Sequence, residues 1–464
     1  MSATPVQSAP VRLSPREREV AALVAEGLTN RDIAKRLFIS ERTVDGHLEH
    51  LREKLAVNTR SQIATWVVRE GTAGAVVAAP AASAMTSAPA RRLMARPQIW
   101  VATALVLAVL AAGVGLLRLT APPDPTIRTI AGATISFSSY PGGGYTGDGG
   151  PAISAQLSRP SDVAVAPDGT IYIADYGNNV VRRVAAGVIN PYAGHADRPL
   201  ATEGEIADTV SFGYPSNLAV DPGGNVYVLT DLAGILEVWK VRPDRSISLV
   251  VSIGQNVSTD YWRTPAGGLA VAKDGTLYIA DGANHRVWKF ANGRMSAYAG
   301  TGKRGFSNDG GAAASAMLDW PMGLALDQHG NLFIADMENN RIRKVDAFGM
   351  IATVAGTGEE GDSGDGGRAL QARLSIPFGV AVAADGTLVI ADTGNNRLRI
   401  VRPSQQIEAL AGTAQSGFAG DGFPAIAAKL NGPEGVAFDT GGDLFVADTG
   451  NQRVREISRL VPPA

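Results

Sequence analysis

Residues 377–397 read PFGVAVAADGTLVIADTGNNR, and this stretch decides the fold of most of the chain. Two short apolar runs flank an Asp-Gly pair, and the second run ends in Ala-Asp before a Gly-Asn-Asn turn. An Asp-Gly pair between such runs is a strong hairpin signal, because tight hairpin turns need the positive φ angles that these residues tolerate. The stretch therefore predicts two antiparallel strands followed by a second tight turn.

The same pattern occurs six times along the chain. Each copy opens at a proline, and successive prolines are 50 to 56 residues apart: Pro160, Pro215, Pro265, Pro321, Pro377 and Pro433. A third and a fourth strand follow, as in RLRIV (397–401) and IEALAG (407–412) of the fifth copy. Four short antiparallel strands per repeat are typical of a propeller blade, and we favour a propeller over an open solenoid.

The two ends of the repeat region predict that the ring closes. The last copy supplies three strands, whereas a lone fourth strand, IRTIAG (127–132), precedes the first copy and matches IATVAG (351–356). We expect this early strand to complete the sixth blade, which leaves the ring without an exposed edge. The expected fold of residues 127–464 is thus an all-β propeller of six blades.

Specific residues link this region to a known family. The combination of GVAV, DG, LYIAD and NNR over residues 127–460 resembles the NHL-repeat propellers. Gly-rich segments that occur in bacterial members of that family are also present: GDGGPA (147–152), NDGGAA (308–313), GDGGRA (364–369) and GDGFPA (420–425). The resemblance implies the fold but no single function, because NHL propellers include ligand sensors, protein-binding modules and a few enzymes.

The acid that ends the second strand of most copies raises the question of a metal site. Its five occurrences would lie around the ring instead of meeting at one ion: Asp175, Asp281, Asp336, Asp392 and Asp448. The D-x-x-N-N spacing suits asparagine side chains that fold back onto a tight turn, so we interpret these acids as structural. We predict no metal site, no cofactor and no catalytic residue, with calcium loops in the Gly-rich segments as the alternative.

The second copy departs from the pattern and is the candidate binding region. Thr230 replaces the repeated acid, LAGIL (232–236) replaces the Asn-Asn-Arg turn, and an unusual loop (193–213) precedes the copy. Loops between blades and loops between second and third strands emerge on one rim of a propeller. Candidate ligand- or partner-binding residues on that rim are Tyr214, Tyr261, Trp262 and Arg263. The three histidines of this region, His195, His285 and His329, occupy unrelated repeat positions and are expected at the surface.

Residues 11–71 carry the marks of a compact all-α domain. Capping boxes begin at Ser14 and at Thr29, and residues 41–55 form a longer predicted helix. Apolar residues at helical spacing give that helix an inward face: Val44, Leu48, Leu51 and Leu55. A short helix, a three-residue turn and a longer helix make a helix-turn-helix, whose second helix can enter the major groove of DNA.

The sequences REREV (16–20), GLTNRDIAKRL (27–37), RTV (42–44) and KL (54–55) resemble the LuxR-type helix-turn-helix family. The resemblance covers nearly all of residues 13–70 and implies binding to double-stranded DNA, a recognition helix at 41–55 and a homodimer formed through a fourth helix. Candidate DNA-binding residues are Arg36, Arg42, Thr43, Gly46, His47, His50 and Lys54. Asp45 stands where the family commonly has a basic residue, so we expect modest affinity.

An uncharged apolar stretch, residues 98–117, separates the two regions. About twenty such residues in a helix span the roughly 30 Å hydrocarbon layer, so we expect a single transmembrane helix. Arg91, Arg92 and Arg96 before it outweigh Arg118 after it, which predicts a cytoplasmic N-terminus and an extracytoplasmic propeller. Alanine and glycine at four-residue spacing within the stretch could also support helix dimerisation.

The remaining segments are linkers. Residues 1–10 are expected to be disordered, residues 72–97 form an Ala- and Pro-rich linker, and residues 118–126 connect the expected membrane helix to the propeller. The chain has no cysteine, which excludes disulfides and thiolate chemistry, and its net charge of −2 requires any DNA binding to come from a local surface.

The order of the segments favours a one-component transcription regulator of the inner, or plasma, membrane. An extracytoplasmic propeller would bind an unknown ligand or protein and control the cytoplasmic DNA-binding domain. Two alternatives use the same parts: a tethered extracytoplasmic enzyme of lyase or lactonase type, and an adhesion or scaffold propeller. The sequence names neither ligand nor operator.

Overall fold

The computed structural model describes residues 124–133, 144–195, 198–232, 234–254, 267–307, 309–458 and 460, together with thirteen positions between Val20 and Leu55. The chain divides into two compact units, Met1–Ala112 and Gly113–Ala464, which are described separately. Among the residues described, no helix is long and apolar enough to cross a membrane. The apolar stretch 98–117, the linker 72–97, residues 118–123 of the second linker and residues 1–10 lie outside them.

The N-terminal unit has the predicted apolar interior. Its described residues are helical except Thr29, whose carbonyl accepts a hydrogen bond from the Ile33 N–H at 3.0 Å. The buried side chains repeat at helical spacing: Val20, Ala21, Leu23, Val24, Ile33, Val44, Leu48 and Leu51. Leu55 is half-buried. The last of these positions form the inward face that the sequence predicts for residues 41–55.

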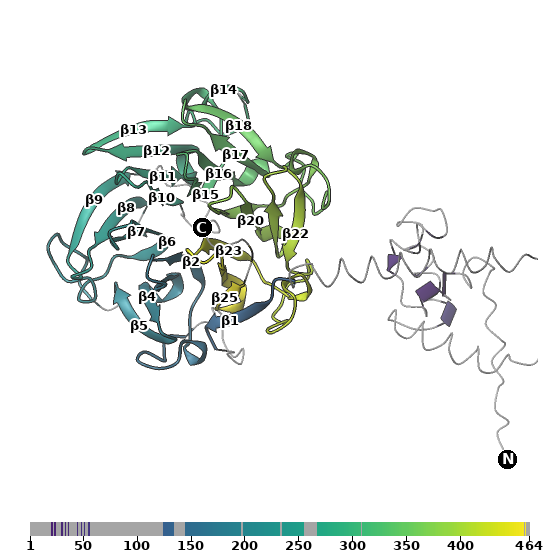
Figure 1. Cartoon of the computed structure of the whole chain (residues 1–464), viewed down its shortest axis with the longest axis horizontal. Helices are drawn as coiled ribbons and strands as arrows, with labels where there is room; N and C mark the ends of the chain where they lie inside the picture. Colours follow the sequence, from purple (N-terminus) through teal and green to yellow (C-terminus); the bar gives the residue numbers. More distant parts are fainter. Residues whose placement is uncertain are drawn as a thin grey trace, which may run out of the picture. The chain divides into compact units, whose positions relative to one another are not determined.

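The C-terminal unit is a ring of six antiparallel sheets, seen face-on in Figure 1. Blade 1 contains β2 (Pro160–Val165), β3 (Ile171–Asp175), β4 (Val180–Ala185) and β5 (Val188–Ala193). Blade 2 contains β6 (Tyr214–Val220), β7 (Val226–Leu232), β8 (Ile235–Val241) and β9 (Ile247–Gly254). Blade 3 contains β10 (Leu269–Val271), β11 (Leu277–Asp281), β12 (Arg286–Ala291) and β13 (Arg294–Ala299).

The other three blades repeat this order. Blade 4 contains β15 (Pro321–Leu326), β16 (Leu332–Asp336), β17 (Arg341–Val345) and β18 (Met350–Ala355), and the short β14 (Gly311–Ala312) pairs with β18. Blade 5 contains β19 (Pro377–Val382), β20 (Leu388–Asp392), β21 (Arg397–Val401) and β22 (Ile407–Ala411). Blade 6 contains β23 (Pro433–Phe438), β24 (Leu444–Asp448), β25 (Arg453–Ile457) and β1 (Ile127–Ala131).

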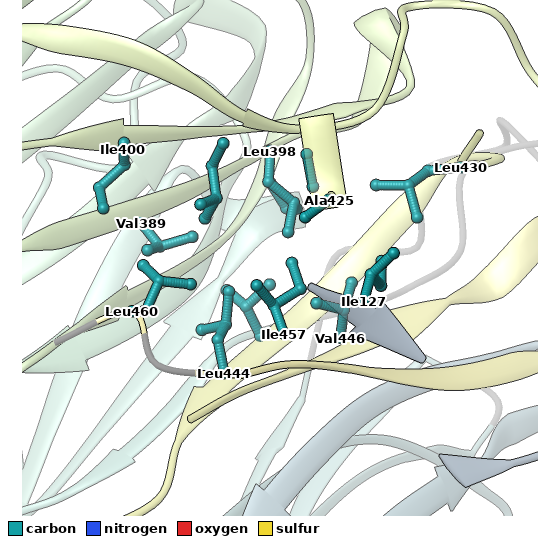
Figure 2. Close-up of a cluster of buried hydrophobic side chains, with 14 of the residues drawn as sticks. Ile127, Val389, Leu398, Ile400, Ala425, Leu430, Leu444, Val446, Ile457 and Leu460 are labelled. Carbon is teal, nitrogen blue, oxygen red and sulfur yellow. The ribbon is translucent and has the colours of Figure 1, made fainter. Parts of the chain in front are cut away.

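The predicted ring closure is confirmed by the pairing of β1 with β25. The two strands are antiparallel, with Ile127 opposite Ile457, and Figure 1 shows the blue β1 beside the yellow β25. Ile127 is fully buried in the core of blade 6, near Val446 and Ile457 (Figure 2). Burial of such a side chain stabilises a fold by about 1.5–3 kcal/mol, so the early strand is an integral part of the blade.

The tight turn after each second strand explains the paired asparagines of the repeat. In blade 5 a 3-10 turn, η7 (Thr393–Asn395), follows Asp392, and Asn396 ends it with φ of 52°. Asparagine tolerates this left-handed conformation better than most residues because its short polar side chain bonds locally. Asn179 and Asn340 hold the equivalent conformation in blades 1 and 4.

Glycine near the start of the inner strand has a packing role. A Cβ atom at Gly379 would lie 2.1 Å from the carbonyl oxygen of Glu434 in the next blade, and one at Gly323 would lie 2.6 Å from that of Phe378. The inner strands of blades 4, 5 and 6 therefore approach each other too closely for a side chain at Gly323 or Gly379. The GVAV motif is thus a requirement of the crowded ring centre.

Candidate functional site

Two of the seven candidate DNA-binding residues lie among the described positions. Arg36 and Lys54 are both helical and both exposed, as contact with DNA phosphates requires. Lys54 lies between the buried Leu51 and the half-buried Leu55, so its backbone is fixed by the interior of the domain. The other five, Arg42, Thr43, Gly46, His47 and His50, lie outside the described residues.

The repeated acids of the propeller are structural, as the D-x-x-N-N spacing predicts. In blade 5, Asp392 is fully buried; its Oδ1 accepts from the Ser375 N–H at 2.8 Å, and its Oδ2 accepts from the Asn395 side chain at 2.8 Å. A third donor was not foreseen from the sequence: Nη1 of Arg399 lies 3.4 Å from the same Oδ2. Burial raises the pKa of Asp392, and these donors oppose that rise.

Arg399 joins this acid to a second one in the Gly-rich segment. Its side chain is fully buried, and its Nη2 lies 2.7 Å from Asp365 of GDGGRA. We call this Asp–Arg–Asp arrangement the clasp. Three other blades have it, through Arg182 with Asp175 and Asp148, Arg343 with Asp336 and Asp309, and Arg455 with Asp448 and Asp421. In each blade the clasp ties the third strand to the loop that precedes the blade.

Blades 2 and 3 lack both the arginine and the Gly-rich segment. In blade 3, Trp288 occupies the arginine position, and its indole N–H donates to Asp281 at 3.0 Å. In blade 2, Thr230 and Glu237 occupy the two positions, and the Thr230 hydroxyl lies 3.4 Å from the Glu237 carbonyl oxygen. Arginine and Gly-rich segment are therefore present together in four blades and absent together from the other two.

The calcium alternative concerns the same Gly-rich segments. The acids that it would use, Asp148, Asp309, Asp365 and Asp421, each contact the buried arginine of their blade. Within the described ranges, no three histidine, aspartate or glutamate side chains gather closely enough to hold a metal ion. In each of these loops the acid therefore forms an ion pair with arginine.

The three propeller histidines do not converge. His329 is exposed on the hairpin turn of blade 4, as expected. His285 is half-buried: its side chain is 16% exposed, and its Nδ1 accepts from the Trp320 N–H at 3.2 Å. His285 replaces the second asparagine of the turn, and its ring reaches the next blade. His195 lies in the loop between blades 1 and 2, where its ring meets the ring of Tyr145 edge-on.

The same inter-blade bond recurs around the rim. Asn340 accepts from the Ile376 N–H and Asn396 accepts from the Gly432 N–H, both at 2.9 Å, and Gln452 accepts from the Arg159 N–H. The bond is missing between blades 1 and 2, where Oδ1 of Asn179 is buried and has no hydrogen-bond partner in the described structure. The rim is thus continuous from blade 3 through blades 4, 5 and 6 to blade 1, and it is interrupted before blade 2.

The inner strands of blades 1 and 2 begin beside this interruption, at Pro160 and Tyr214, and we call this end of the ring the channel mouth. The rings of Tyr176 and Tyr214 stack at a centroid distance of 5.3 Å, and the Arg159 guanidinium lies 5.3 Å from the Tyr176 ring. Glu434 of blade 6 lines the same small cavity as Tyr176 and Arg159. Burial raises the pKa of Glu434 to about 8, an effect that Asp162 strengthens and Arg159 opposes. Of the four candidate ligand-binding residues, Tyr214 is therefore at the mouth, while Tyr261, Trp262 and Arg263 lie outside the described residues.

The channel behind the mouth is polar on one side. The inner strands line a cavity of about 260 Å³. Asp162 and Asn217 occupy the position at which the other blades have glycine, and each accepts a hydrogen bond at 2.8 Å from the next inner strand, at Leu218 and Leu269 respectively. Burial raises the pKa of Asp162 to about 7. Sequence reasoning missed Asp162 and Glu434, although both break a repeat that is glycine or apolar in blades 4 and 5.

Comparisons with known proteins agree with this division of the chain. Residues 11–67 match the luxR family of bacterial regulatory proteins. Residues 266–290, 374–401 and 430–457 match the NHL repeat, and residues 120–185, 144–260 and 295–362 match the teneurin NHL domain. The N-terminal unit carries a LuxR-family helix-turn-helix domain, and the C-terminal unit is an NHL-repeat propeller.

Individual relatives match one part of the chain at a time. Mouse teneurin-4 is 30% identical over 280 residues, which are 56% of this chain and 8% of teneurin-4. An HTH-type transcriptional regulator of Mycobacterium bovis is 52% identical over 59 residues, 13% of this chain and 7% of that protein. An auxiliary nutrient binding protein from Bacteroides thetaiotaomicron shares the fold, with a TM-score of 0.54 at 14% identity over 72% of this chain and 76% of its own.

Proposed function

We propose that this protein is a membrane-anchored, one-component transcription regulator in which an extracytoplasmic NHL propeller controls a cytoplasmic LuxR-type DNA-binding domain. The observation that carries the proposal is the order of the parts in one chain. A domain of bacterial regulatory proteins (11–67) and a closed propeller flank an uncharged apolar stretch of membrane-spanning length (98–117). The arginines before that stretch support a cytoplasmic N-terminus.

The ligand site of the proposed sensor is the channel mouth. There a stacked tyrosine pair, Tyr176 and Tyr214, lies beside the partly polar channel and the interrupted rim. Aromatic faces and a few placed polar groups are what small-molecule sites in proteins use. A ligand or a partner loop bound there would contact blades 1 and 2 together, and this contact is the proposed input of the switch.

Chromosomal binding tests the regulator. The full-length protein should occupy specific sites, and a chain lacking residues 127–464 should occupy the same sites without responding to the signal. Unchanged regulation in the truncated chain would favour the scaffold alternative. A reporter fusion that places the N-terminus outside the cell would contradict the proposed topology.

Lys54 tests the DNA contact at single-residue resolution. Lys54→Gln should weaken binding by a similar factor on all DNA sequences and lower the slope of log affinity against log salt by about 1, because one phosphate contact is lost. Lys303→Gln, at an exposed propeller site, is the matched control and should leave the slope unchanged. Equal slopes for both variants would remove Lys54 from the DNA interface.

A further inference from the structure

The Gly-rich segment of blade 6 differs from the other three copies at its exposed positions. Phe423 stands where the other copies have Gly150, Gly311 and Gly367, and its side chain is 66% exposed. Three residues later Ile426 is 47% exposed, at a position where Ile153 (59%) and Leu370 (50%) are exposed as well, so Phe423 is what distinguishes blade 6. Ala427 is also exposed, where the other copies have Ser154, Ser315 and Gln371.

The exposed side chains of the FPAIA segment (423–427), those of Phe423, Ile426 and Ala427, are therefore all apolar and uncharged, while Ala425 is buried. A large apolar side chain exposed to water is unfavourable in free energy. Phe423 is not needed for the core, because three other blades fold with glycine at this position. Contiguous exposed apolar residues of this kind mark surfaces that contact a partner or a membrane.

The FPAIA segment lies against the part of the chain that arrives from the apolar stretch. The Ile127 N–H donates to the Phe423 carbonyl at 3.2 Å, and the Ala425 N–H donates to the Pro125 carbonyl at 2.8 Å. Thr126 and Pro424 form an antiparallel bridge between these two hydrogen bonds. Phe423 and Ile426 are thus fixed beside residues 125–127 by backbone hydrogen bonds.

The length of the connection limits how far this surface can lie from a bilayer. Eight residue steps separate Leu117 from Pro125. Fully extended, they span at most about 28 Å, and the headgroup layer occupies about 5–8 Å of that distance. The connection joins the ring at blade 6, and the Gly-rich loop of that blade carries Phe423 where the other three copies have glycine.

We propose that the FPAIA segment docks onto the lipid bilayer, with Phe423 and Ile426 inserted at the boundary between headgroups and acyl chains. The inference rests on the proposed membrane anchor and adds a second contact to it. Because the tether keeps the segment at high local concentration near the bilayer, two apolar side chains are enough to bias the propeller toward one orientation. The docked propeller presents a defined face to the outside, whereas an undocked one rotates freely on its tether.

Site-specific fluorescence on the full-length chain in phosphatidylcholine–phosphatidylglycerol vesicles tests the docking. The protein has no cysteine, so Ile426→Cys carries a single environment-sensitive label. Leu370→Cys is the matched control, because Leu370 is the equivalent residue of blade 5 and is 50% exposed. Phe348→Cys, at the most exposed apolar residue described, 90% exposed on blade 4, controls for nonspecific adsorption.

The expected result is that lipid-borne quenchers reduce the emission of the label at 426 at least about twofold more than the emission at 370 or 348, as interfacial insertion requires. Adding Phe423→Asp to Ile426→Cys should abolish the difference. Equal quenching at all three sites, in a chain that resists alkaline extraction from the vesicles, would overturn the docking and leave the anchor intact. Extraction of the chain from the vesicles would overturn both the docking and the membrane anchor. Disulfide-linked dimers of Phe423→Cys, formed without lipid quenching, would show that the segment contacts a second copy of the chain instead of the bilayer.

Discussion

Blades 4, 5, 6 and 1 differ from blades 2 and 3 in how they are held together. The first group has the Asp–Arg–Asp clasp in every blade, and the rim bond joins each of its members to the next. Blade 3 replaces the arginine with Trp288, and blade 2 replaces both central clasp residues. Residues at the channel mouth cluster where the two groups meet. The comparison teaches that this ring has a uniform arc, held by buried ion pairs, and a divergent arc that was free to change.

Removing the clasp arginine should have the largest effect on the uniform arc. Arg399→Ala leaves Asp392 buried without its cationic partner, so the free energy of unfolding should fall by about 3–5 kcal/mol. Trp288→Ala in blade 3 removes a neutral donor and some packing. Its smaller expected loss, measured by the same denaturant titration, provides the comparison. Equal losses would mean that the clasp contributes no more than the tryptophan that replaces it.

The outer acid of the clasp should matter less than the inner one. Asp365 is partly exposed, and water can replace it as a partner of Arg397 and Arg399. Asp365→Asn should lower the free energy of unfolding by about 1–3 kcal/mol, the cost of weakening a charge-assisted hydrogen bond. Asp385→Asn, in an exposed hairpin turn of the same blade, is the control. An effect as large as that of Arg399→Ala would show that the loop and the core form one unit.

The stability of the propeller should depend on pH through the titration of Glu434 at the channel mouth. Its pKa rises from 4.5 to about 8 on folding because the carboxyl is desolvated, so the folded state binds more protons than the unfolded state between these values. This contribution to stability is complete below about pH 4.5 and is lost as the pH rises toward 8. Glu434→Gln should therefore melt near the wild-type temperature at pH 4.5 and a few degrees higher at pH 9, because at pH 9 the wild type buries a charged carboxylate and the variant a neutral amide. The same difference in melting temperature between the two proteins at pH 4.5 and at pH 9 would contradict the raised pKa of Glu434.

Loss of one inter-blade hydrogen bond at the rim should give the smallest change in the free energy of unfolding. Two equivalent asparagines, one with the bond and one without it, provide closely matched variants. Asn396 and Asn179 share the left-handed conformation, which glycine adopts without strain, but only Asn396 makes the inter-blade bond. Asn396→Gly should cost about 1 kcal/mol of unfolding free energy, the typical value of one hydrogen bond, and Asn179→Gly should cost almost nothing. A reversed order would mean that the gap before blade 2 is not a weak point.

The repeat fixed most of the fold in advance, because proline spacing, Asp-Gly turns and the lone strand at 127–132 are all local signals. The structural role of the repeated acids also followed from local spacing. The clasp could not be predicted from local spacing, because Asp365 and Arg399 are 34 residues apart in the sequence and meet only when the loop folds over the strand. Their joint absence from blades 2 and 3 was a usable signal. Glu434 and Asp162 could not be placed at one mouth without the ring, because they belong to the last and the first blade.

The pairing of β1 with β25 also has a mechanical meaning. Tension on the N-terminal connection would reach the propeller at Pro125 and pass directly into β1, the outermost strand of blade 6. That strand is held by β25 on one side and by backbone bonds to Gly422 and Phe423 on the other. The seam that closes the ring is therefore also the point that bears a load, and stretching the tether far enough would open the propeller at this blade before any other.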